Sequence, residues 1–294
     1  MAPETILTNP SETELALAVQ ENLFALFRAM AADLPESDLV ASAGLHYHLT
    51  SPNNPMFKGV WGTRLGPDEA DQAIERTILW FQERRAPFFF WWTGPGTSPA
   101  DLGRRLQAHG LLDMAEQLHD LAAGIVSTES GAPGMFADLS RMNESALASV
   151  PQGFTISEVQ NETDLQDFKR VLVEGYEIPE PMADGWVQAA HRVGIGRTTW
   201  KMYLGRLDGE PVATNMLLNG GGVAGLYGVA TVPAARGKGI GGAISLAPLL
   251  EARRMGYRWA VLFATEMGVH AYERIGFRLT DARINRYLWR NPGG

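Results

Sequence analysis

The stretch from Leu226 to Ser245 has the composition of a phosphate-binding turn. A β-prone run ends at Pro233, a loop with Arg236, Lys238 and spaced glycines follows, and an apolar helical pattern begins near residue 240. Glycines let the main chain approach a ligand closely, so consecutive N–H groups can converge on an oxyanion at the positive end of a helix dipole. Residues 240–250 include no acidic side chain. The pattern therefore predicts a cradle that binds a phosphate group.

Two common nucleotide-binding motifs, the Walker loop and the dinucleotide fingerprint, are alternative interpretations of this stretch. A Walker loop ends in Gly-Lys-[Ser/Thr], but Ala243 follows Gly242 here, so phosphoryl transfer of that type is excluded. Gly237, Gly239 and Gly242 satisfy the dinucleotide fingerprint G-x-G-x-x-G, and Glu266 could bind a ribose. A doubly wound fold needs several further strand–helix units, however, and only 28 residues follow Glu266. The length of the chain therefore argues against a dinucleotide fold.

The elements that must position the cradle follow a clear order in the second half of the chain. Hydrophobic periodicity predicts a strand, two helices, a hairpin around Asp208-Gly209 and a third strand before the loop. A helix with Pro248 inside it follows, and we expect a kink there. The predicted ranges are 154–159, 162–174, 181–193, 200–207, 211–218, 223–232, 240–255, 259–264, 269–275, 277–279 and 284–288.

Composition limits the class of protein. The chain has 294 residues, 45% of them hydrophobic and 20% charged, with a formal net charge of −8 that argues against a general nucleic-acid binder. It contains no cysteine, which excludes disulfides and thiolate chemistry. The first ten residues do not resemble a signal peptide, and charged residues interrupt each long apolar run, so we expect a cytoplasmic protein that does not insert into membranes.

The order of elements and three motifs resemble the GNAT superfamily of acetyl-CoA-dependent N-acetyltransferases. The motifs are Arg236-Gly-Lys-Gly-Ile-Gly241, which fits [Arg/Gln]-x-x-Gly-x-[Gly/Ala], Val229-Ala-Thr-Val-Pro233, and Tyr272-Glu-Arg-Ile-Gly-Phe277. The match covers about residues 154–290. The resemblance implies an α/β (α+β) fold with a mixed, mostly antiparallel central sheet flanked by helices.

The resemblance also implies roles for individual residues. Acetyl-CoA would be the acyl donor, with its pyrophosphate on the loop and its pantetheine arm along Val229 and Thr231. Tyr272 would be the catalytic general acid that protonates the leaving thiolate, and an ordinary tyrosine pKa of about 10 keeps it protonated at neutral pH. The residues assigned to cofactor binding are Val229, Ala230, Thr231, Arg236, Gly237, Lys238, Gly239, Ile240, Gly241 and Gly242.

Some features depart from the family pattern. Thr265 replaces an asparagine that is often found a turn before the tyrosine, and no glutamate precedes the cradle to act as a base. Glu266, His270 or ordered water remain candidates. The implied reaction is transfer of an acetyl group to a primary amine of a small molecule by direct attack. Tyr176, Glu177 and Trp186 lie in the helix-loop-helix that borders the acceptor cleft in the family, although they could equally be surface and packing residues. The alternative is a non-catalytic acyl-CoA-binding or regulatory module.

The first half of the chain, residues 1–150, follows the same order of elements as residues 151–294, which suggests a tandem protein with a degenerate N-terminal GNAT-like domain. A strand over 57–65, a helix over 68–85, a strand over 88–92 and Leu106-Gln-Ala-His-Gly-Leu111 follow one another, so Leu106 stands in the place of Tyr272. Asp68 and Glu69 occupy the helix start, where they would repel a pyrophosphate. We expect this half to bind no cofactor and to help shape the acceptor pocket.

Two other patterns in the first half have structural interpretations. His46 and His48 alternate on a predicted strand and would share one face, but no third ligand is near, so no metal site is predicted. The aromatic run Phe88–Trp92 has no interleaved basic residues and therefore predicts a buried strand rather than a nucleic-acid stacking surface.

Overall fold

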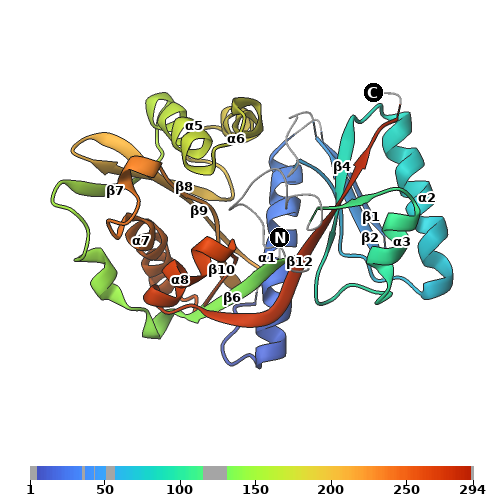
Figure 1. The fold of residues 1–294 in the computed structure, drawn as a ribbon, viewed down its shortest axis with the longest axis horizontal. Helices are drawn as coiled ribbons and strands as arrows, with labels where there is room; N and C mark the ends of the chain where they lie inside the picture. The colour runs from blue at the N-terminus through green and yellow to red at the C-terminus, as the bar shows by residue number, and fades with distance from the viewer. Residues whose placement is uncertain (1–4, 35–36, 43, 51–56, 115–130, 293–294) are drawn as a thin grey trace.

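Strands from both halves of the chain share one sheet in the computed structural model, which describes residues 5–34, 37–42, 44–50, 57–114 and 131–292. Within those ranges the sheet has twelve strands in the order β1-β2-β3-β4-β12-β6-β11-β10-β9-β8-β7, with β5 paired to β12 (Figure 1). The strands are β1 Asp38–Ser42, β2 Leu45–Leu49, β3 Lys58–Trp61, β4 Phe88–Thr93, β5 Leu112–Asp113, β6 Ala132–Asp138, β7 Phe154–Glu158, β8 Lys201–Leu207, β9 Glu210–Gly220, β10 Val223–Thr231, β11 Trp259–Phe263 and β12 Arg278–Arg290.

Helices flank this sheet. They are α1 Glu12–Asp33, α2 Pro67–Glu83, α3 Leu102–Ala108, α5 Glu162–Tyr176, α6 Glu180–Val193, α7 Ile240–Arg254 and α8 Glu266–Ile275, with short 3-10 turns η2 Leu139–Arg141, η3 Glu144–Leu147 and η4 Pro233–Ala235. Of the strand pairs described, β3–β4 and β10–β11 are parallel and the others antiparallel. The predicted fold class, a mixed and mostly antiparallel sheet flanked by helices, is confirmed.

The two halves of the sheet repeat one pattern and exchange a strand. β1-β2-β3 and β8-β9-β10 are antiparallel meanders, and each continues through a parallel neighbour, β4 or β11. The next strand in each case comes from the other half: β12 pairs with β4, and β6 pairs with β11. The sheet therefore crosses the predicted division of the chain into residues 1–150 and 151–294, and that division stays a prediction.

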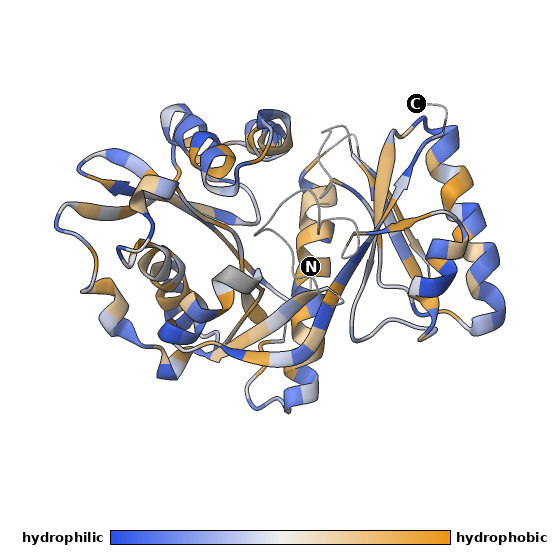
Figure 2. Ribbon diagram, viewed as in Figure 1, coloured by the Kyte–Doolittle hydropathy of each residue, from blue (hydrophilic) through white to orange (hydrophobic). Residues whose placement is uncertain are grey.

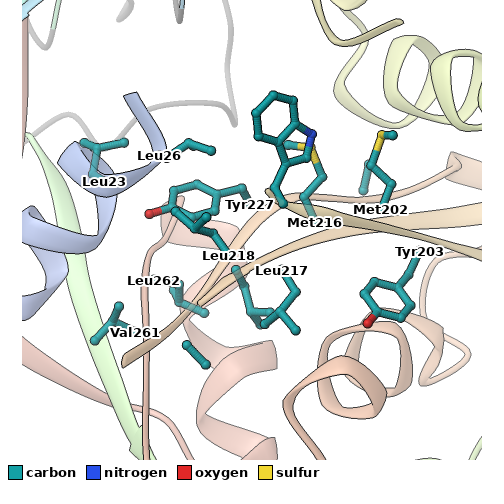
Figure 3. Close-up of a cluster of buried hydrophobic side chains, with 14 of the residues drawn as sticks. Leu23, Leu26, Met202, Tyr203, Met216, Leu217, Leu218, Tyr227, Val261 and Leu262 are labelled. Atoms are coloured by element: carbon teal, nitrogen blue, oxygen red, sulfur yellow. The ribbon is translucent and has the colours of Figure 1, made fainter. Parts of the chain in front are cut away.

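Helix α1 lies at the centre of the molecule. Ser11 and Glu14 form a capping box at its start, which satisfies two main-chain N–H groups. Figure 2 shows the helix to be hydrophobic over much of its length, and Figure 3 places Leu23 and Leu26 beside Tyr227 of β10. By length and composition α1 is the one described helix that meets the criteria for a membrane span, but most of that window is buried in the core. Its apolar face is thus accounted for by core packing.

A buried asparagine ties α1 to the second half of the sheet. The Asn22 side chain donates to the carbonyls of Gly220 and Val223, at 2.6 and 3.3 Å, and accepts from the Tyr227 hydroxyl at 2.5 Å. Because a buried amide without partners costs free energy, this set of bonds fixes α1 over the turn between β9 and β10. The core of the second half therefore depends on a helix from the first half.

The first half of the sheet is covered on both faces. Val60, Phe89 and Trp91 pack with α2 and α3, whereas Trp61 and Trp92 pack with α1. Adjacent residues of a strand point to opposite faces, which explains this division. The run Phe88–Trp92 thus forms a buried strand as predicted.

Three predicted segments differ from the observed ones. The strand predicted over 57–65 ends at Trp61, because Gly62 adopts a positive φ of 67° and the chain turns away. The two last predicted strands are one strand, β12, with a register shift between Leu279 and Arg283. Strand β6 lies before the predicted division of the chain, but it pairs with β11 and β12 instead of with first-half strands. Local patterns do not encode such long-range pairing.

Pro248 lies inside α7, where its missing N–H leaves the carbonyl of Ile244 without its usual helical partner. The side chain of Asn215 on β9 donates to that carbonyl at 2.8 Å. A polar residue buried in the sheet thus replaces the bond that the proline removes.

Candidate functional site

The strands β10 and β11 separate at the place where the sequence predicts the cradle. Their parallel pairing is confined to Ala224–Ala260 and Gly225–Val261, although β10 continues to Thr231. A bulge in β10 contributes to the separation, because Gly228 adopts a positive φ of 55° and the register with β9 shifts between Tyr227 and Ala230. Within the described chain, residues 229–231 do not pair with β11, so their main chain faces a gap in the sheet.

Helix α7 begins next to this gap with its dipole unoccupied. Gly239 is the N-cap residue in the left-handed conformation, with φ 78°, and no side chain caps the first turn. That turn contains no acidic residue, as predicted. A Cβ at Gly237, where φ is 75°, would meet nothing within 4 Å, so the space beside the loop is open. The free N–H groups of the first turn are therefore available to an anion.

A cavity of about 1040 Å³ joins the gap to the start of α7. Nine of the residues predicted for the site line it: Val229, Ala230, Thr231, Arg236, Gly237, Gly239, Gly241, Gly242 and Tyr272. Two predicted residues do not. Ile240 is buried in the core, and the Lys238 ammonium donates to the carbonyl of Ala234 at 3.0 Å.

The side chain of Arg236 links α5 to β10 in the wall of the cavity and does not extend freely into the cavity. Its guanidinium donates to the carbonyls of Gly175 and Thr231, at 2.8 and 3.2 Å, and lies 3.5 Å from the carboxylate of Glu177. Gly175 permits this approach of α5 to β10, because a Cβ there would come within 2.8 Å of Ala230. The sequence identified Arg236 as a site residue but not this bridging geometry.

Tyr272 lies on α8 with its ring against the cavity. The ring packs edge-on to Phe277, with the centroids 5.8 Å apart, and passes close to Gly268, where a Cβ would be 3.1 Å from the ring. Burial raises the pKa of Tyr272 above its ordinary value, and the nearby Tyr176 raises it further. Burial also raises the pKa of Tyr176, to about 12. Both phenols are therefore protonated at neutral pH and able to donate a hydrogen bond or a proton.

Groups able to act as a general base are scarce in this cavity. Among its described lining residues the one carboxylate is Glu177, which faces Arg236. His270 does not line the cavity, is 84% exposed and bonds to Glu273 at 3.0 Å. The side chain of Glu266, the other candidate, lies outside the described part of the structure. Thr265 lines the cavity but accepts from the N–H of Gly268 as the N-cap of α8.

The sequence model of the acetyltransferase (GNAT) family matches residues 165–277, which include the gap, the cradle and Tyr272. This part of the chain belongs to the GNAT family. No curated protein matches the sequence.

Solved structures of GNAT proteins share the fold of nearly the whole chain. A GCN5-related N-acetyltransferase from Kribbella flavida has a TM-score of 0.67 at 17% identity, with 94% of this chain and 96% of that one covered. A tandem GNAT protein from the clavulanic acid biosynthesis pathway has a TM-score of 0.57 at 15% identity, with 97% of both chains covered. A GCN5-related N-acetyltransferase from Sphaerobacter thermophilus has a TM-score of 0.56 at 15% identity, with 96% and 94% covered. At these identities the likeness concerns the fold.

The GNAT domain has one wall that the sequence did not reveal. Asn143, Ser145, Ala146 and Ser149, from the segment between β6 and β7, line the cavity together with Arg274 of α8. The segment is polar and short of regular structure, so no periodic pattern distinguishes it from an ordinary linker. The one sequence feature that could have indicated this wall is the pair of glycines that the segment contacts, at positions 239 and 242. A glycine admits a close protein neighbour as well as a ligand.

Proposed function

We propose that this protein transfers an acetyl group from acetyl-CoA to a primary amine of a small molecule. The observation that carries the proposal is the meeting of three features in one cavity: an acid-free helix start, a gap beside β10 and the hydroxyl-bearing Tyr272. Each feature has a counterpart in the reaction, since the donor brings a pyrophosphate, an extended arm and a leaving thiolate. Membership of the GNAT family supports acyl transfer in general.

The residues of the cavity suit the donor. The free N–H groups at the start of α7 and the open space beside Gly237 would hold the pyrophosphate. The unpaired edge of β10 at Val229 and Thr231 would bind the amide groups of the pantetheine arm as a strand neighbour would. When bound, acetyl-CoA supplies the thioester that the amine attacks.

Tyr272 is assigned the role of general acid. The amine nitrogen forms a bond to the thioester carbonyl carbon, the carbon–sulfur bond breaks, and the hydroxyl of Tyr272 gives its proton to the departing sulfur. The raised pKa of Tyr272 keeps that proton in place before the step. Because no carboxylate or imidazole other than Glu177 lines the described cavity, the amine enters neutral and its surplus proton leaves to water.

The same scarcity of bases supports a second candidate function, a non-catalytic acyl-CoA-binding or regulatory module. Such a module would keep the cradle and the gap and would need no group to handle the proton of an acceptor. Tyr272 would then be a packing residue of α8, in contact with Phe277.

Calorimetry and a turnover assay together test these proposals. Titration with acetyl-CoA and with NADH reports the ligand class, and release of free thiol from acetyl-CoA across a panel of primary amines reports transfer. Binding of acetyl-CoA with amine-dependent thiol release supports the acetyltransferase. Binding without release for any amine supports the module. Binding of NADH alone would contradict both and return the dinucleotide interpretation.

We further propose that residues 1–150 and 151–294 are tandem copies of one unit and that the first copy binds no donor. Helices α3 and α8 end alike, with Gly110 and Gly276 at positive φ, and the N–H of the following residue bonds to the carbonyl of Leu106 or Tyr272. This supports the alignment of Leu106 with Tyr272. The first copy would instead support the second through α1 and border its acceptor pocket.

A further inference from the structure

We propose that the first half of the chain binds a small hydroxycarboxylate in a second cavity, which lies between β4, β12 and the start of α3. This cavity has a volume of about 360 Å³, and none of its described lining residues belongs to the donor cavity of the second half. The volume is at the lower end of the range for small-molecule sites. Binding there would not depend on acetyl transfer, because the two cavities are separate.

Three polar side chains line this second cavity from two neighbouring strands. Thr93 of β4 and Asn285 of β12 are paired directly across the strands, and Arg283 lies two residues before Asn285. Alternate residues of a strand share one face of the sheet, so Arg283 and Asn285 stand on the same face. That face is the one covered by α3, whose first turn also lines the cavity (Figure 1).

The polar groups of these side chains are unused within the described part of the chain. The guanidinium of Arg283 makes no hydrogen bond or ion pair there, and the hydroxyl of Thr93 makes no hydrogen bond, although Thr93 is only 8% exposed. The side-chain oxygen of Asn285 lies against Gly131, where a Cβ would come within 1.7 Å of it, so the amide nitrogen is left for the cavity. Buried polar groups normally have partners, which a bound molecule would supply here.

The opposite wall of the second cavity is a loop with a second role. Residues 97, 99, 100 and 101 line the cavity, and Ser98 between them pairs with the chain after β3. The N–H of Ser98 donates to the carbonyl of Thr63, and the N–H of Leu65 donates to the carbonyl of Ser98. The loop that closes the gap between the first parallel strands therefore also encloses this cavity.

The charges around the second cavity favour a single negative charge on the ligand. Arg104 and Asp101, which both line it, pair with each other at 3.2 Å, and Asp101 also accepts from Arg105 at 3.1 Å. Arg283 adds one positive charge without a counterion among the described residues. An ammonium group on the ligand is disfavoured, because Asp101 is the one carboxylate among the described lining residues and already binds two guanidiniums.

The donors and their spacing select the chemical class. A carboxylate matches the paired N–H donors of Arg283, and such charge-assisted bonds are stronger than neutral ones. A hydroxyl on the neighbouring carbon would accept from the amide of Asn285 and donate to the hydroxyl oxygen of Thr93. The remaining carbons would contact Pro99 and Leu102, which line the same cavity.

The experiment compares probes that differ by one group. Ligand-observed NMR titrations on the full chain at low salt use 2-hydroxybutyrate, butyrate, 1,2-butanediol and 2-aminobutyrate. We expect 2-hydroxybutyrate to bind roughly fivefold more tightly than butyrate, which lacks the hydroxyl, and roughly tenfold more tightly than 1,2-butanediol, which lacks the carboxylate. The amino acid should bind more weakly than 2-hydroxybutyrate, and acetyl-CoA should displace none of the probes.

Substitutions assign the groups of the probe to residues. Arg283→Met should weaken both 2-hydroxybutyrate and butyrate roughly tenfold, and because Arg283 is exposed the change leaves folding intact. Thr93→Val keeps the shape of the side chain and should weaken 2-hydroxybutyrate roughly fivefold while leaving butyrate unchanged. Arg290→Met, which removes an exposed arginine of β12 outside the cavity, is the matched control and should change neither affinity.

Four results would contradict this site. They are a lack of saturable binding of 2-hydroxybutyrate by the unchanged protein, equal binding of 2-hydroxybutyrate and 1,2-butanediol, displacement of the probe by acetyl-CoA, and unchanged affinity after Arg283→Met. Displacement would place the probe in the donor cavity, and unchanged affinity would place it elsewhere on the protein. None of these results bears on whether the second half transfers acetyl groups, which the turnover assay measures separately.

Discussion

The starts of α7 and α2 stand at equivalent places in the two halves of the sheet. Helix α7 connects the parallel strands β10 and β11, paired through Ala224 and Ala260, and α2 connects β3 and β4, paired through Gly59 and Phe90. In α7 the second helical residue is Gly241; in α2 it is Asp68. The same helix dipole therefore meets open space in one half and carboxylates in the other.

The gap beside the strand differs as well. Beyond its parallel pair β10 has no described partner on the side of β11, whereas the chain after β3 pairs with Ser98. The N–H of Ser98 donates to the carbonyl of Thr63 at 3.0 Å, and the N–H of Leu65 donates to the carbonyl of Ser98 at 3.2 Å. Residue 98 thus takes the place that an extended ligand would need.

The two short helices complete the contrast. Tyr272 faces the cavity, but Leu106 is fully buried between α2 and the sheet. The two halves share strand order, parallel pairs and helix ends while differing at the helix start, the gap and the acid. This fold therefore supplies a location for a site, and a few side chains and one loop decide whether a ligand can occupy it.

The largest predicted effect concerns the acid. Tyr272→Phe should lower kcat roughly a hundredfold or more, because the thiolate must then leave without a positioned proton donor. The dissociation constant of acetyl-CoA should stay within about twofold, since the ring remains in contact with Phe277. Leu106→Met, in the equivalent position of the first half, is the control for helix packing. Unchanged turnover in the phenylalanine variant would contradict the assignment of Tyr272.

The next largest effect is predicted for a substitution that gives the helix start of the second half an acidic residue, as in the first half. Gly241→Asp should weaken acetyl-CoA binding roughly 30-fold to 100-fold, because the carboxylate takes up the dipole and repels the pyrophosphate. Space does not prevent the change, since a Cβ at Gly241 would be 3.6 Å from the hydroxyl of Thr231. Gly241→Asn has the same shape without the charge and should weaken binding much less. Equal losses in both variants, measured by calorimetry, would mean that size matters here and charge does not.

Much of this contrast was accessible from the sequence because it depends on local features. The sequence shows directly that residues 236–250 contain glycines and no acidic residue, and that Asp68 and Glu69 stand together. Helix starts follow local sequence rules, so both features could be interpreted without the structure. The closing of the first gap by Ser98 and the exchange of β6 and β12 depend on pairing between distant segments. The bridging role of Arg236 also required the structure, because an arginine next to glycines is equally compatible with a ligand and with a carbonyl.

The protonation of the two reactants gives a third prediction. Burial and Tyr176 hold the pKa of Tyr272 above its ordinary value, so the acid stays protonated as pH rises. No base competes in the described cavity apart from Glu177, so the neutral fraction of the amine sets the rate. For an amine of pKa about 10, kcat/KM should rise roughly tenfold per pH unit from pH 6 to 9 without a descending limb. A plateau that begins near pH 7 would reveal a base in the protein.

A fourth prediction concerns α7 itself. This helix contains Pro248 in its interior, whereas α2 has no proline after its first turn. Asn215→Ala should lower the free energy of unfolding by about 1–3 kcal/mol, because the buried carbonyl of Ile244 then has no partner. The loss should be smaller in the Pro248→Ala background, where the restored N–H serves the same carbonyl. Asn219→Ala on the same strand is the control. Urea unfolding measures all four variants, and additive losses would contradict the coupling.

The smallest effect is predicted for the reverse change, which removes the acidic residues from the helix start of the first half. Asp68→Asn with Glu69→Gln removes both carboxylates from the start of α2 and should lower the melting temperature by roughly 1–2 °C, because the dipole loses its favourable charges. The variant should gain no second site for acetyl-CoA, since Ser98 still fills the gap and Leu106 still occupies the place of the acid. Calorimetry should thus give one ligand per chain, as in the unchanged protein. A stoichiometry of two would show that repulsion alone keeps the donor out of the first half, and that the closed gap yields when the charges are gone.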